Sequence, residues 1–330
     1  MPTLLSPTPS AILPTPLPST DIFERNRRLG RGVNLGDALE APHEGEWGVI
    51  VQAEYFRLMA EAGFDSVRLP IRWSAYAGDQ APFTIQPAFF ERVDWAVNQA
   101  LENGLVVIID LHHYVEMMSE PDDHRERLMA LWRQVAEHYQ AYPEDVYFEV
   151  LNEPNGVLGG ELWNEIAAEA LAVIRETNPT RPVILGPDGW NGVRQLGALR
   201  LPEEDRNLIV TFHYYLPFEF THQGADWVDG SDAWLGTTWT GTPSQQKAIE
   251  ADFDYAAAWG EQNERPIYLG EFGAYNRADM ASRALWTATV ARQAELRGFS
   301  WGYWEFCSGF GVYDRVRQTW VEPLRQALLP

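Results

Sequence analysis

Apolar runs alternate with longer amphipathic segments along most of the chain. The segment LVVIID, residues 105–110, is almost continuously apolar, which is typical of a parallel strand covered on both faces. The segment before it, residues 87–104, has helical spacing and one apolar stripe, formed by Phe90, Val93, Val97 and Leu101. A helix is therefore followed by a strand, and the pattern predicts a β/α unit.

The same pattern recurs along the chain. Strand-like segments are expected at 31–36, 65–71, 105–110, 146–151, 182–187, 207–215, 266–273 and 299–306. Helical stretches separate most of them, and the stretch at 160–177 carries the stripe Leu162, Ile166, Ala170 and Ile174. Eight such units in 330 residues predict an α/β fold, a single-domain (β/α)8 TIM barrel. An open doubly wound sheet is the alternative, but no glycine-rich phosphate loop follows the first strand.

Residues 1–20 differ from the rest of the chain. They hold six of its 22 prolines, together with several Ser and Thr residues. This composition predicts an extended or disordered tail or linker before a barrel domain at 21–330. The segment lacks the basic start and the long apolar core of a signal peptide, and no stretch of the chain approaches the roughly 20 apolar residues that span a membrane.

Charge narrows the range of partners. The formal net charge is −22, which argues against nucleic acid or an anionic membrane as a partner. The single cysteine, Cys307, has no second cysteine in the chain with which to form a disulfide. The 14 tryptophans fit either a large core or a surface that stacks on sugars.

Polar side chains collect where the predicted strands end. In a TIM barrel these ends meet at one mouth, which carries the chemistry. The residues are Arg68, His112, His113, Asn152, Glu153, His213, Tyr215, Glu271, Trp304 and Glu305. A single one would be explained by a structural ion pair or a core histidine, but six strands ending in this way favour a functional site.

Strand alternation extends the prediction inward. If Glu153 points into the barrel, Leu151 and Glu149 lie on the same side of that strand, with Glu149 deeper as the structural partner of a cation. Ile267 and Leu269 are likewise expected on the side of Glu271. The two carboxylates would then stand above apolar floors.

Two carboxylates at one barrel mouth predict glycosidic cleavage. A retaining mechanism uses one as the nucleophile and the other as the acid/base, about 5 Å apart, and their mutual repulsion separates their pKa values. Arg68 is expected to keep the nucleophile anionic, Tyr215 to hydrogen-bond it and His213 to orient the acid/base. Asn152 is placed to bind a sugar 2-hydroxyl.

Seven ordered motifs resemble those of glycoside hydrolase family 5, especially its bacterial endo-β-1,4-glucanases, some of which also cleave mannan. The motifs are RGVNLGDALEAP, VRLPIRW, IIDLHHY, EVLNEPNG, HYYLPFEFTHQGADW, YLGEFGAY and YWEFCSGFGVYD. The resemblance implies that Glu153 is the acid/base and Glu271 the nucleophile, with Arg68, Asn152, His213 and Tyr215 completing the catalytic group. It also implies substrate contacts from His112, His113, Trp304, Asp37, Glu40, Trp227 and Glu305. Asp37 departs from the amide that similar enzymes often carry, so the resemblance leaves open the preference for glucose or mannose at the remote subsite.

The resemblance further implies a β-linked polysaccharide or oligosaccharide substrate, no cofactor and no metal. We expect a monomer, secreted because of its substrate class. A metal-dependent barrel hydrolase is a rival interpretation, since Asp110, His112 and His113 have ligand chemistry, but there is no HExxH motif. A non-catalytic sugar-binding protein is a second rival, with Trp190, Trp234 and Trp239 as a stacking surface. Such a protein does not need two opposed carboxylates.

Overall fold

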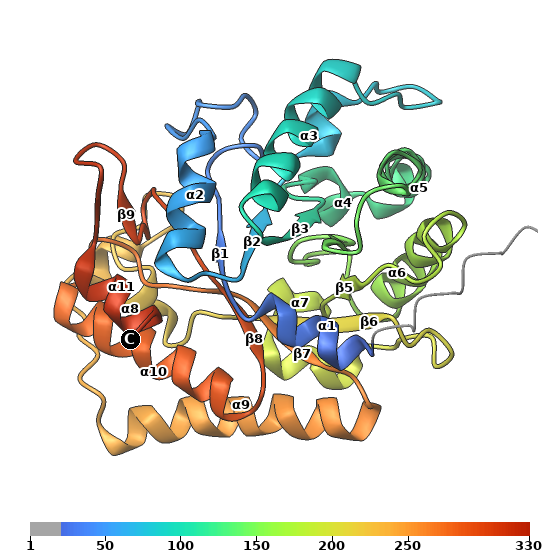
Figure 1. The fold of residues 1–330 in the computed structure, drawn as a ribbon. Coiled ribbons are helices and arrows are strands. Elements are labelled where there is room, and N and C mark those ends of the chain that lie inside the picture. Colours follow the sequence, from blue (N-terminus) through green and yellow to red (C-terminus); the bar gives the residue numbers. More distant parts are fainter. Residues whose placement is uncertain (1–20) are drawn as a thin grey trace, which may run out of the picture.

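The computed structural model describes residues 21–330 (Figure 1). Eight parallel strands pair in chain order and close into a barrel, so the predicted (β/α)8 fold is confirmed. The strands are β1 (Arg31–Asn34), β2 (Ser66–Leu69), β3 (Val106–Asp110), β4 (Val146–Glu149), β5 (Val183–Leu185), β6 (Leu208–Tyr214), β7 (Ile267–Phe272) and β8 (Ser300–Tyr303). Each lies within its predicted segment. The expected tail, residues 1–20, lies outside the described residues.

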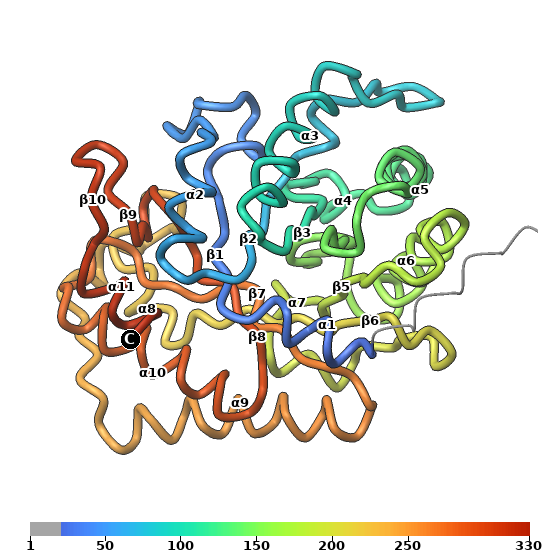
Figure 2. Tube along the Cα trace, in the orientation of Figure 1, coloured from blue at the N-terminus to red at the C-terminus, as the bar shows by residue number. Residues whose placement is uncertain are grey.

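Helices surround the barrel and connect its strands (Figure 1). They are α1 (Ile22–Leu29), α2 (Ala53–Ala62), α3 (Pro87–Glu102), α4 (Val115–Ser119), α5 (Pro121–Tyr139), α6 (Gly160–Arg175), α7 (Asp188–Asn191), α8 (Phe218–Thr221), α9 (Pro243–Asn263), α10 (Met280–Leu296) and α11 (Glu322–Leu328). Three short 3-10 helices are η1 (Trp73–Tyr76), η2 (Val193–Ala198) and η3 (Ser231–Trp234). Two short strands, β9 (Tyr313–Asp314) and β10 (Thr319–Trp320), form a separate antiparallel pair beside the barrel (Figure 2).

The buried faces of the helices are broader than the predicted stripes. Helix α3 buries Phe89, Val93, Ala96, Val97 and Ala100, whereas Phe90 and Leu101 are only half-buried. Both still pack against the core, so the predicted stripe is part of a broader buried face. The ring of Phe90 lies at the edge of the interface and stacks on His138 of α5, at a centroid distance of 4.3 Å. On α6 three of the four residues of the predicted stripe, Ile166, Ala170 and Ile174, are buried.

Helix α1, which the sequence pattern did not predict, closes the end of the barrel opposite the strand C-termini. Its Ile22 and Leu29 join the small apolar cluster inside the barrel. The amide of Asn26 donates to the carbonyl of Ile267 at 3.1 Å, and the hydroxyl of Ser66 donates to that of Leu29 at 2.6 Å. The open mouth is therefore at the C-terminal ends of the strands, where this fold carries its chemistry.

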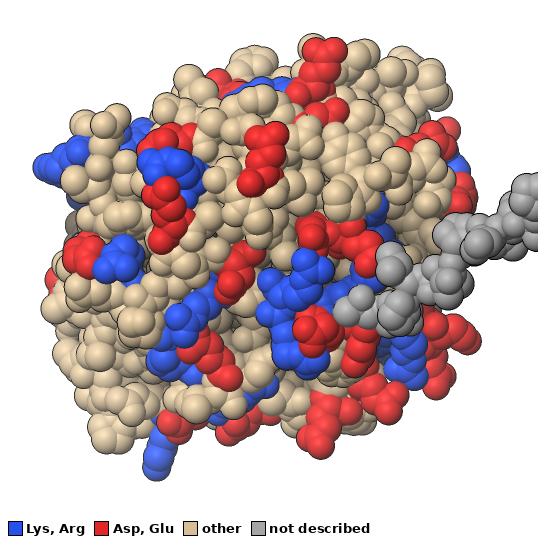
Figure 3. All heavy atoms as spheres, in the orientation of Figure 1, with Lys and Arg blue, Asp and Glu red and all other residues tan. Residues whose placement is uncertain are grey.

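Acidic and basic side chains intermix on the face of the molecule shown in Figure 3. Many of them are paired along one helix, as Arg57 is with Glu54 and Glu61 on α2. The net negative charge is therefore not concentrated as one acidic patch on this face. Among residues 21–330, no helix is long and apolar enough to cross a membrane.

Candidate active site

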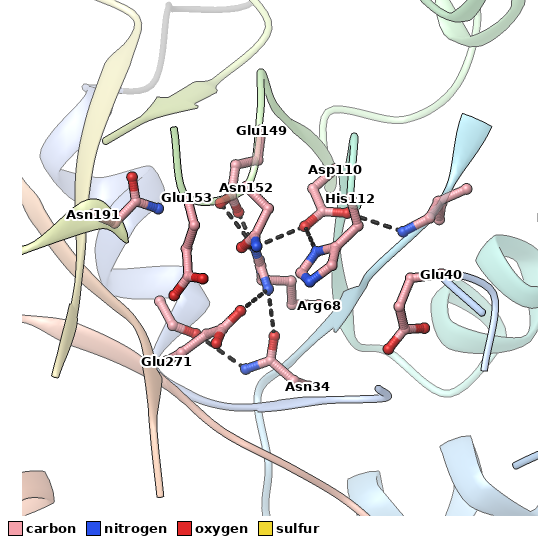
Figure 4. A network of polar contacts seen from close by, with 12 residues as sticks. Asn34, Glu40, Arg68, Asp110, His112, Glu149, Asn152, Glu153, Asn191 and Glu271 are labelled. Atoms are coloured by element: carbon pink, nitrogen blue, oxygen red, sulfur yellow. Dashed lines mark hydrogen bonds and ion pairs between the residues drawn. The ribbon is translucent and has the colours of Figure 1, made fainter. Parts of the chain in front are cut away.

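Arg68, at the end of β2, is the centre of a buried polar network (Figure 4). Its Nε and Nη2 donate to both carboxylate oxygens of Glu149, at 2.7 and 2.9 Å. Nη2 also lies 2.7 Å from Oδ2 of Asp110, and Nη1 donates to Glu271 at 2.8 Å. Asn34 and Asn152 each accept from the same guanidinium at 2.9 Å. One cation thus holds three carboxylates and fixes the relative positions of five strand ends, those of β1, β2, β3, β4 and β7.

The prediction that apolar side chains lie beneath the two carboxylates was wrong, because this polar network lies there instead. Glu149 is the structural partner of a cation, as expected, but Leu151 packs in the outer core and Asn152 turns inward instead. On β7, Ile267 and Leu269 also face the outer core, while Tyr268 faces the barrel interior. The pairing of β6 with β7 shifts register, so that Leu269 lies opposite Phe212 but Glu271 lies opposite His213. Such a bulge changes which residues point inward.

Glu271 is held by two donors. Besides Arg68, the hydroxyl of Tyr215 donates to its Oε2 at 2.8 Å. The side chain is only 6% exposed, and burial raises the pKa of its carboxyl above the ordinary value. His213, Arg68 and the Tyr215 hydrogen bond oppose that rise. These contacts favour the anionic form, which a nucleophile requires.

Glu153 lies across the mouth from Glu271 (Figure 4). Its Oε1 is 2.8 Å from Nδ1 of His213, and its side chain is 26% exposed, so it faces the cleft. Burial, and to a smaller extent the negative charge of Glu149, raises the pKa of Glu153 to about 7, although Arg68 opposes this rise. A carboxyl with this pKa is protonated at mildly acidic pH and suits general acid catalysis.

The two carboxyl groups are close together. One oxygen of Glu153, one oxygen of Glu271 and a ring nitrogen of His213 all lie within 4.8 Å of one another. Carboxyl groups of retaining glycosidases are about 5 Å apart, whereas those of inverting enzymes are about 6.5–9.5 Å apart to admit a water molecule. The separation therefore corresponds to the retaining geometry.

Asn152 and His112 present polar atoms beside the carboxylates. Since Oδ1 of Asn152 accepts from Arg68, its Nδ2 group is left to donate elsewhere. Nδ1 of His112 lies 2.7 Å from Oδ2 of Asp110. The ring of His112 stacks on Trp304 with an interplanar angle of 9°. Asp110 thus orients the imidazole, and burial raises the pKa of Asp110 to about 6.

A family model described as Cellulase (glycosyl hydrolase family 5) matches residues 31–309. The chain belongs to glycosyl hydrolase family 5. The resemblance of the seven motifs is thereby confirmed, and the chain is a glycoside hydrolase.

Relatives agree with this assignment. Endoglucanase H of Acetivibrio thermocellus is 35% identical over 316 residues, which are 94% of this chain but only 34% of that protein. The chain thus spans about a third of that relative. A structure of Thermotoga maritima Cel5A in complex with mannotriose is 52% identical, with a TM-score of 0.92, covering 93% of this chain and all of that one. The clostridial cellulose synthase subunit Z of Clostridioides difficile is 40% identical, with a TM-score of 0.89, covering 92% of this chain and 100% of that one.

Some residues that the resemblance to family 5 marks for substrate binding support their own loops. The carboxylate of Glu40 accepts from the backbone N–H groups of Asp37 and Ala38. That of Glu305 accepts from Cys307, Ser308 and Phe310, and burial raises its pKa to about 8. Both side chains are fully buried. Glu40 and Glu305 therefore shape the wall of the site, and their contact with a sugar stays a prediction.

Aromatic side chains line both sides of the mouth. Trp227, 57% exposed, packs edge-on against Tyr275, whose ring also contacts Phe310. His113 packs edge-on against His112 on one side and Trp47 on the other. The sequence pattern did not single out Trp47, because nothing in a loop tryptophan distinguishes cleft from surface.

Trp190 is 60% exposed, and its backbone N–H donates to the carbonyl of Pro154, next to Glu153. This places Trp190 beside the acid/base candidate, a position that the sequence left open. Trp239, by contrast, is 1% exposed and belongs to the core, so its proposed place on a stacking surface was wrong.

Backbone strain concentrates at this mouth. Asp37, His113, Glu153, Trp190 and Asn191 all have φ between 48° and 59°, the left-handed region that non-glycine residues rarely adopt. Such conformations persist only where the surrounding structure enforces them, and they cluster at functional sites.

The possible metal ligands at the mouth bear on the rival interpretation, a metal-dependent barrel hydrolase. Within residues 21–330, the one group of side chains with ligand atoms close enough for a metal is Glu153, His213 and Glu271. Both oxygens of Glu271 already accept hydrogen bonds, and the guanidinium of Arg68 supplies positive charge at 2.8 Å. Of the predicted ligands, Asp110 faces Arg68 and His112. This donor set does not fit a metal centre.

Proposed function

We propose that this family 5 hydrolase is a retaining endo-β-1,4-glucanase that also accepts β-1,4-mannan. The close approach of Glu153 to Glu271, with one carboxylate oxygen of each within 4.8 Å, carries the proposal. The different surroundings of the two groups support their roles. Glu271 has two hydrogen-bond donors, one of which is the cation Arg68, whereas Glu153 has the higher exposure and a pKa of about 7.

In the first step, Oε of Glu271 attacks the anomeric carbon while Glu153 gives its proton to the departing glycosidic oxygen. The glycosidic bond breaks and a covalent glycosyl-enzyme forms. The transition state has oxocarbenium character and positive charge on the sugar. Arg68 faces three carboxylates, so the site carries an excess of negative charge that stabilises this transition state.

In the second step, Glu153 acts as the base. Once Glu271 is esterified its negative charge is gone, so the carboxyl of Glu153 ionises more readily. It removes a proton from water, which attacks the anomeric carbon from the side that the leaving group vacated; the ester bond to Glu271 breaks and its carboxylate is released. Two inversions give net retention. Nδ2 of Asn152 donates to the sugar 2-hydroxyl, an interaction that strengthens in the transition state.

Two observations support the substrate class. The chain is about half identical to Thermotoga maritima Cel5A, whose structures include complexes with mannotriose and with cellobiose. The exposed rings of Trp190 and Trp227 offer stacking surfaces for sugars. We expect the enzyme to be secreted, since such polymers lie outside the cell, and to act as a monomer.

The nucleophile is tested by Glu271→Ala with azide. Activity should fall by about four to six orders of magnitude, and added azide should restore turnover and give the α-glycosyl azide. The wild-type product should keep the β configuration when followed by NMR. An inverted product from the wild-type enzyme would refute the retaining mechanism.

The acid/base is tested by Glu153→Ala on two substrates that differ in leaving group. An activated aryl glycoside needs little protonation, so its first step should suffer far less than that of a cello-oligosaccharide. Equal losses on both would count against Glu153 as the acid. Reducing-sugar release from carboxymethylcellulose, barley glucan, glucomannan and mannan then ranks the substrates, and activity on none of them would refute the substrate assignment.

A further inference from the structure

The side chain of Asn191, the last residue of α7, points at the ring of His213, which contacts the catalytic pair. Its Nδ2 lies 3.3 Å from Nε2 of His213, and the residue is fully buried. Figure 4 places it on the Glu153 side of the network, away from Arg68. None of the family motifs includes Asn191, and the mechanism above does not use it.

Two unfavourable features meet at this residue. Its backbone is left-handed, with φ of 53°, and its Oδ1 is buried without a hydrogen-bond partner. Gly186 makes room for that oxygen, because a Cβ at position 186 would overlap with it. Backbone strain and an unpaired buried oxygen both destabilise the folded protein. Their presence beside the catalytic pair points to a role for Nδ2 of the same amide.

The other side of the imidazole faces Glu153. Nδ1 of His213 lies 2.8 Å from Oε1 of Glu153 and 3.6 Å from Oε2 of Glu271. A neutral imidazole donates through one nitrogen and accepts through the other. If Nε2 accepts from the amide of Asn191, Nδ1 carries the hydrogen and donates it to Glu153.

We propose that Asn191 is a positioning residue for the acid/base, acting by holding His213 in the tautomer whose Nδ1–H donates to Oε1 of Glu153. This inference rests on the proposed function, in which Glu153 is the acid. Because Oε1 is then an acceptor, the acidic proton sits on Oε2 and is delivered from there to the leaving oxygen. In the second step Oε2 takes the proton of the attacking water while His213 keeps its hold on Oε1.

Burial, the largest influence on His213, lowers its pKa and so favours the neutral imidazole. The charged groups that face it are Glu153, Glu271, Arg68, Glu149 and Asp110. On its α7 side, the carboxylate of Asp188 accepts from the backbone N–H of Gly160. The amide of Asn191 is thus the neighbour on that side that selects between the two tautomers.

The direct test is the tautomer itself, read from 15N NMR of the histidine rings and assigned with His213→Gln. In the wild-type enzyme, Nδ1 of His213 should be protonated and Nε2 unprotonated. Asn191→Gly suits the left-handed backbone and therefore folds, but it removes the donor, so the Nδ1–H form should lose its preference. A wild-type His213 protonated at Nε2, or an unchanged spectrum in Asn191→Gly, would overturn the proposal.

Kinetics provide the second readout. Asn191→Gly should lower kcat/KM about threefold to tenfold more for a cello-oligosaccharide than for an activated aryl glycoside, since it impairs protonation of the leaving group. Asn191→Asp would accept from Nε2 and make His213 an imidazolium. That charge would lower the pKa of Glu153, so the alkaline limb of kcat/KM should move to lower pH; an unmoved limb contradicts the proposal.

A matched control is Asn164→Ala on α6. Its buried amide bonds the backbone of Ala198 and Arg200 and does not touch His213, so stability should fall while the leaving-group dependence stays unchanged. If Glu153→Ala shows no leaving-group dependence, the proposed function itself fails. If Glu153→Ala shows it and the Asn191 variants do not, only this inference fails.

Discussion

Nη1 of Arg68 lies 2.8 Å from Oε1 of Glu271, and neither side chain is more than 6% exposed. The same guanidinium binds Glu149 and Asp110, which come from two other strands. The ion pair therefore serves the barrel and the reaction together: it ties strand ends to one another and keeps the nucleophile anionic.

Arg68→Met should destabilise the fold strongly. It leaves three buried carboxylates without their cation, and removing one partner of a buried pair costs about 3–5 kcal/mol. Urea unfolding followed by tryptophan fluorescence measures the loss, which should appear as a lower midpoint. Arg57→Met is the control, because its ion pairs are exposed on α2 and should contribute nothing measurable. Equal midpoints for the two variants would contradict the structural role of Arg68.

The pH profile of kcat/KM should be bell-shaped. The acid must be protonated, so activity should fall as pH rises through the pKa of Glu153, about 7. The nucleophile must be ionised, so activity should also fall as pH drops below the pKa of Glu271, which burial raises above its ordinary value. Glu153→Gln should abolish the alkaline limb. A wild-type profile that stays level well above pH 7 would be incompatible with Glu153 as the acid.

Tyr215→Phe should impair the nucleophile without unfolding the protein. The hydroxyl donates to Oε2 of Glu271, and losing a hydrogen bond to a charged group, at about 1.5–3 kcal/mol, corresponds to a roughly 10- to 150-fold lower kcat. The acidic limb should move to higher pH, since the Glu271 anion loses a donor. Tyr147→Phe is the control: its hydroxyl donates to the backbone carbonyl of Arg25 at the closed end of the barrel, so the acidic limb should not move. If the acidic limb of the pH profile does not move in Tyr215→Phe, that result would argue against the hydrogen bond from Tyr215 to Glu271.

Chelation should leave the activity unchanged. Glu153, His213 and Glu271 have suitable ligand atoms, but Arg68 and Tyr215 already occupy the oxygens of Glu271. Dialysis against EDTA followed by a reducing-sugar assay checks this, with a zinc addition as the second arm. Loss of activity that zinc restores would revive the metal-dependent alternative.

Much of the site follows from strand ends that the sequence reveals. Arg68, Asn152, His213, Tyr215 and Glu271 were predicted as one group because apolar runs mark strands and the polar residue that ends each run stands out. The structure brings them together. Glu149 was also predicted as the deeper partner of a cation, and that cation is Arg68.

Sequence reasoning did not place Asn34, Asp110 or Asn191 in the site. Asn34 and Asp110 also end strands, and Asp110 was considered only as a metal ligand; their distances to Arg68 reveal them as part of the network. Asn191 ends the short helix α7 between β5 and β6, where its backbone is left-handed and its amide contacts His213. A single sequence carries no clear mark of that conformation in a non-glycine residue.

The sequence by itself determined the order of strands and helices and the residues placed at the barrel mouth, because apolar periodicity and strand termination are local properties of the chain. The tertiary structure decided which of those residues face one another and what lies beneath them. The register shift between β6 and β7 turns Glu271 inward beside His213. Alternation counted along the strand therefore predicts the wrong residues beneath Glu271. An extra residue in one strand changes every later inward position, and only pairing with a neighbouring strand reveals it.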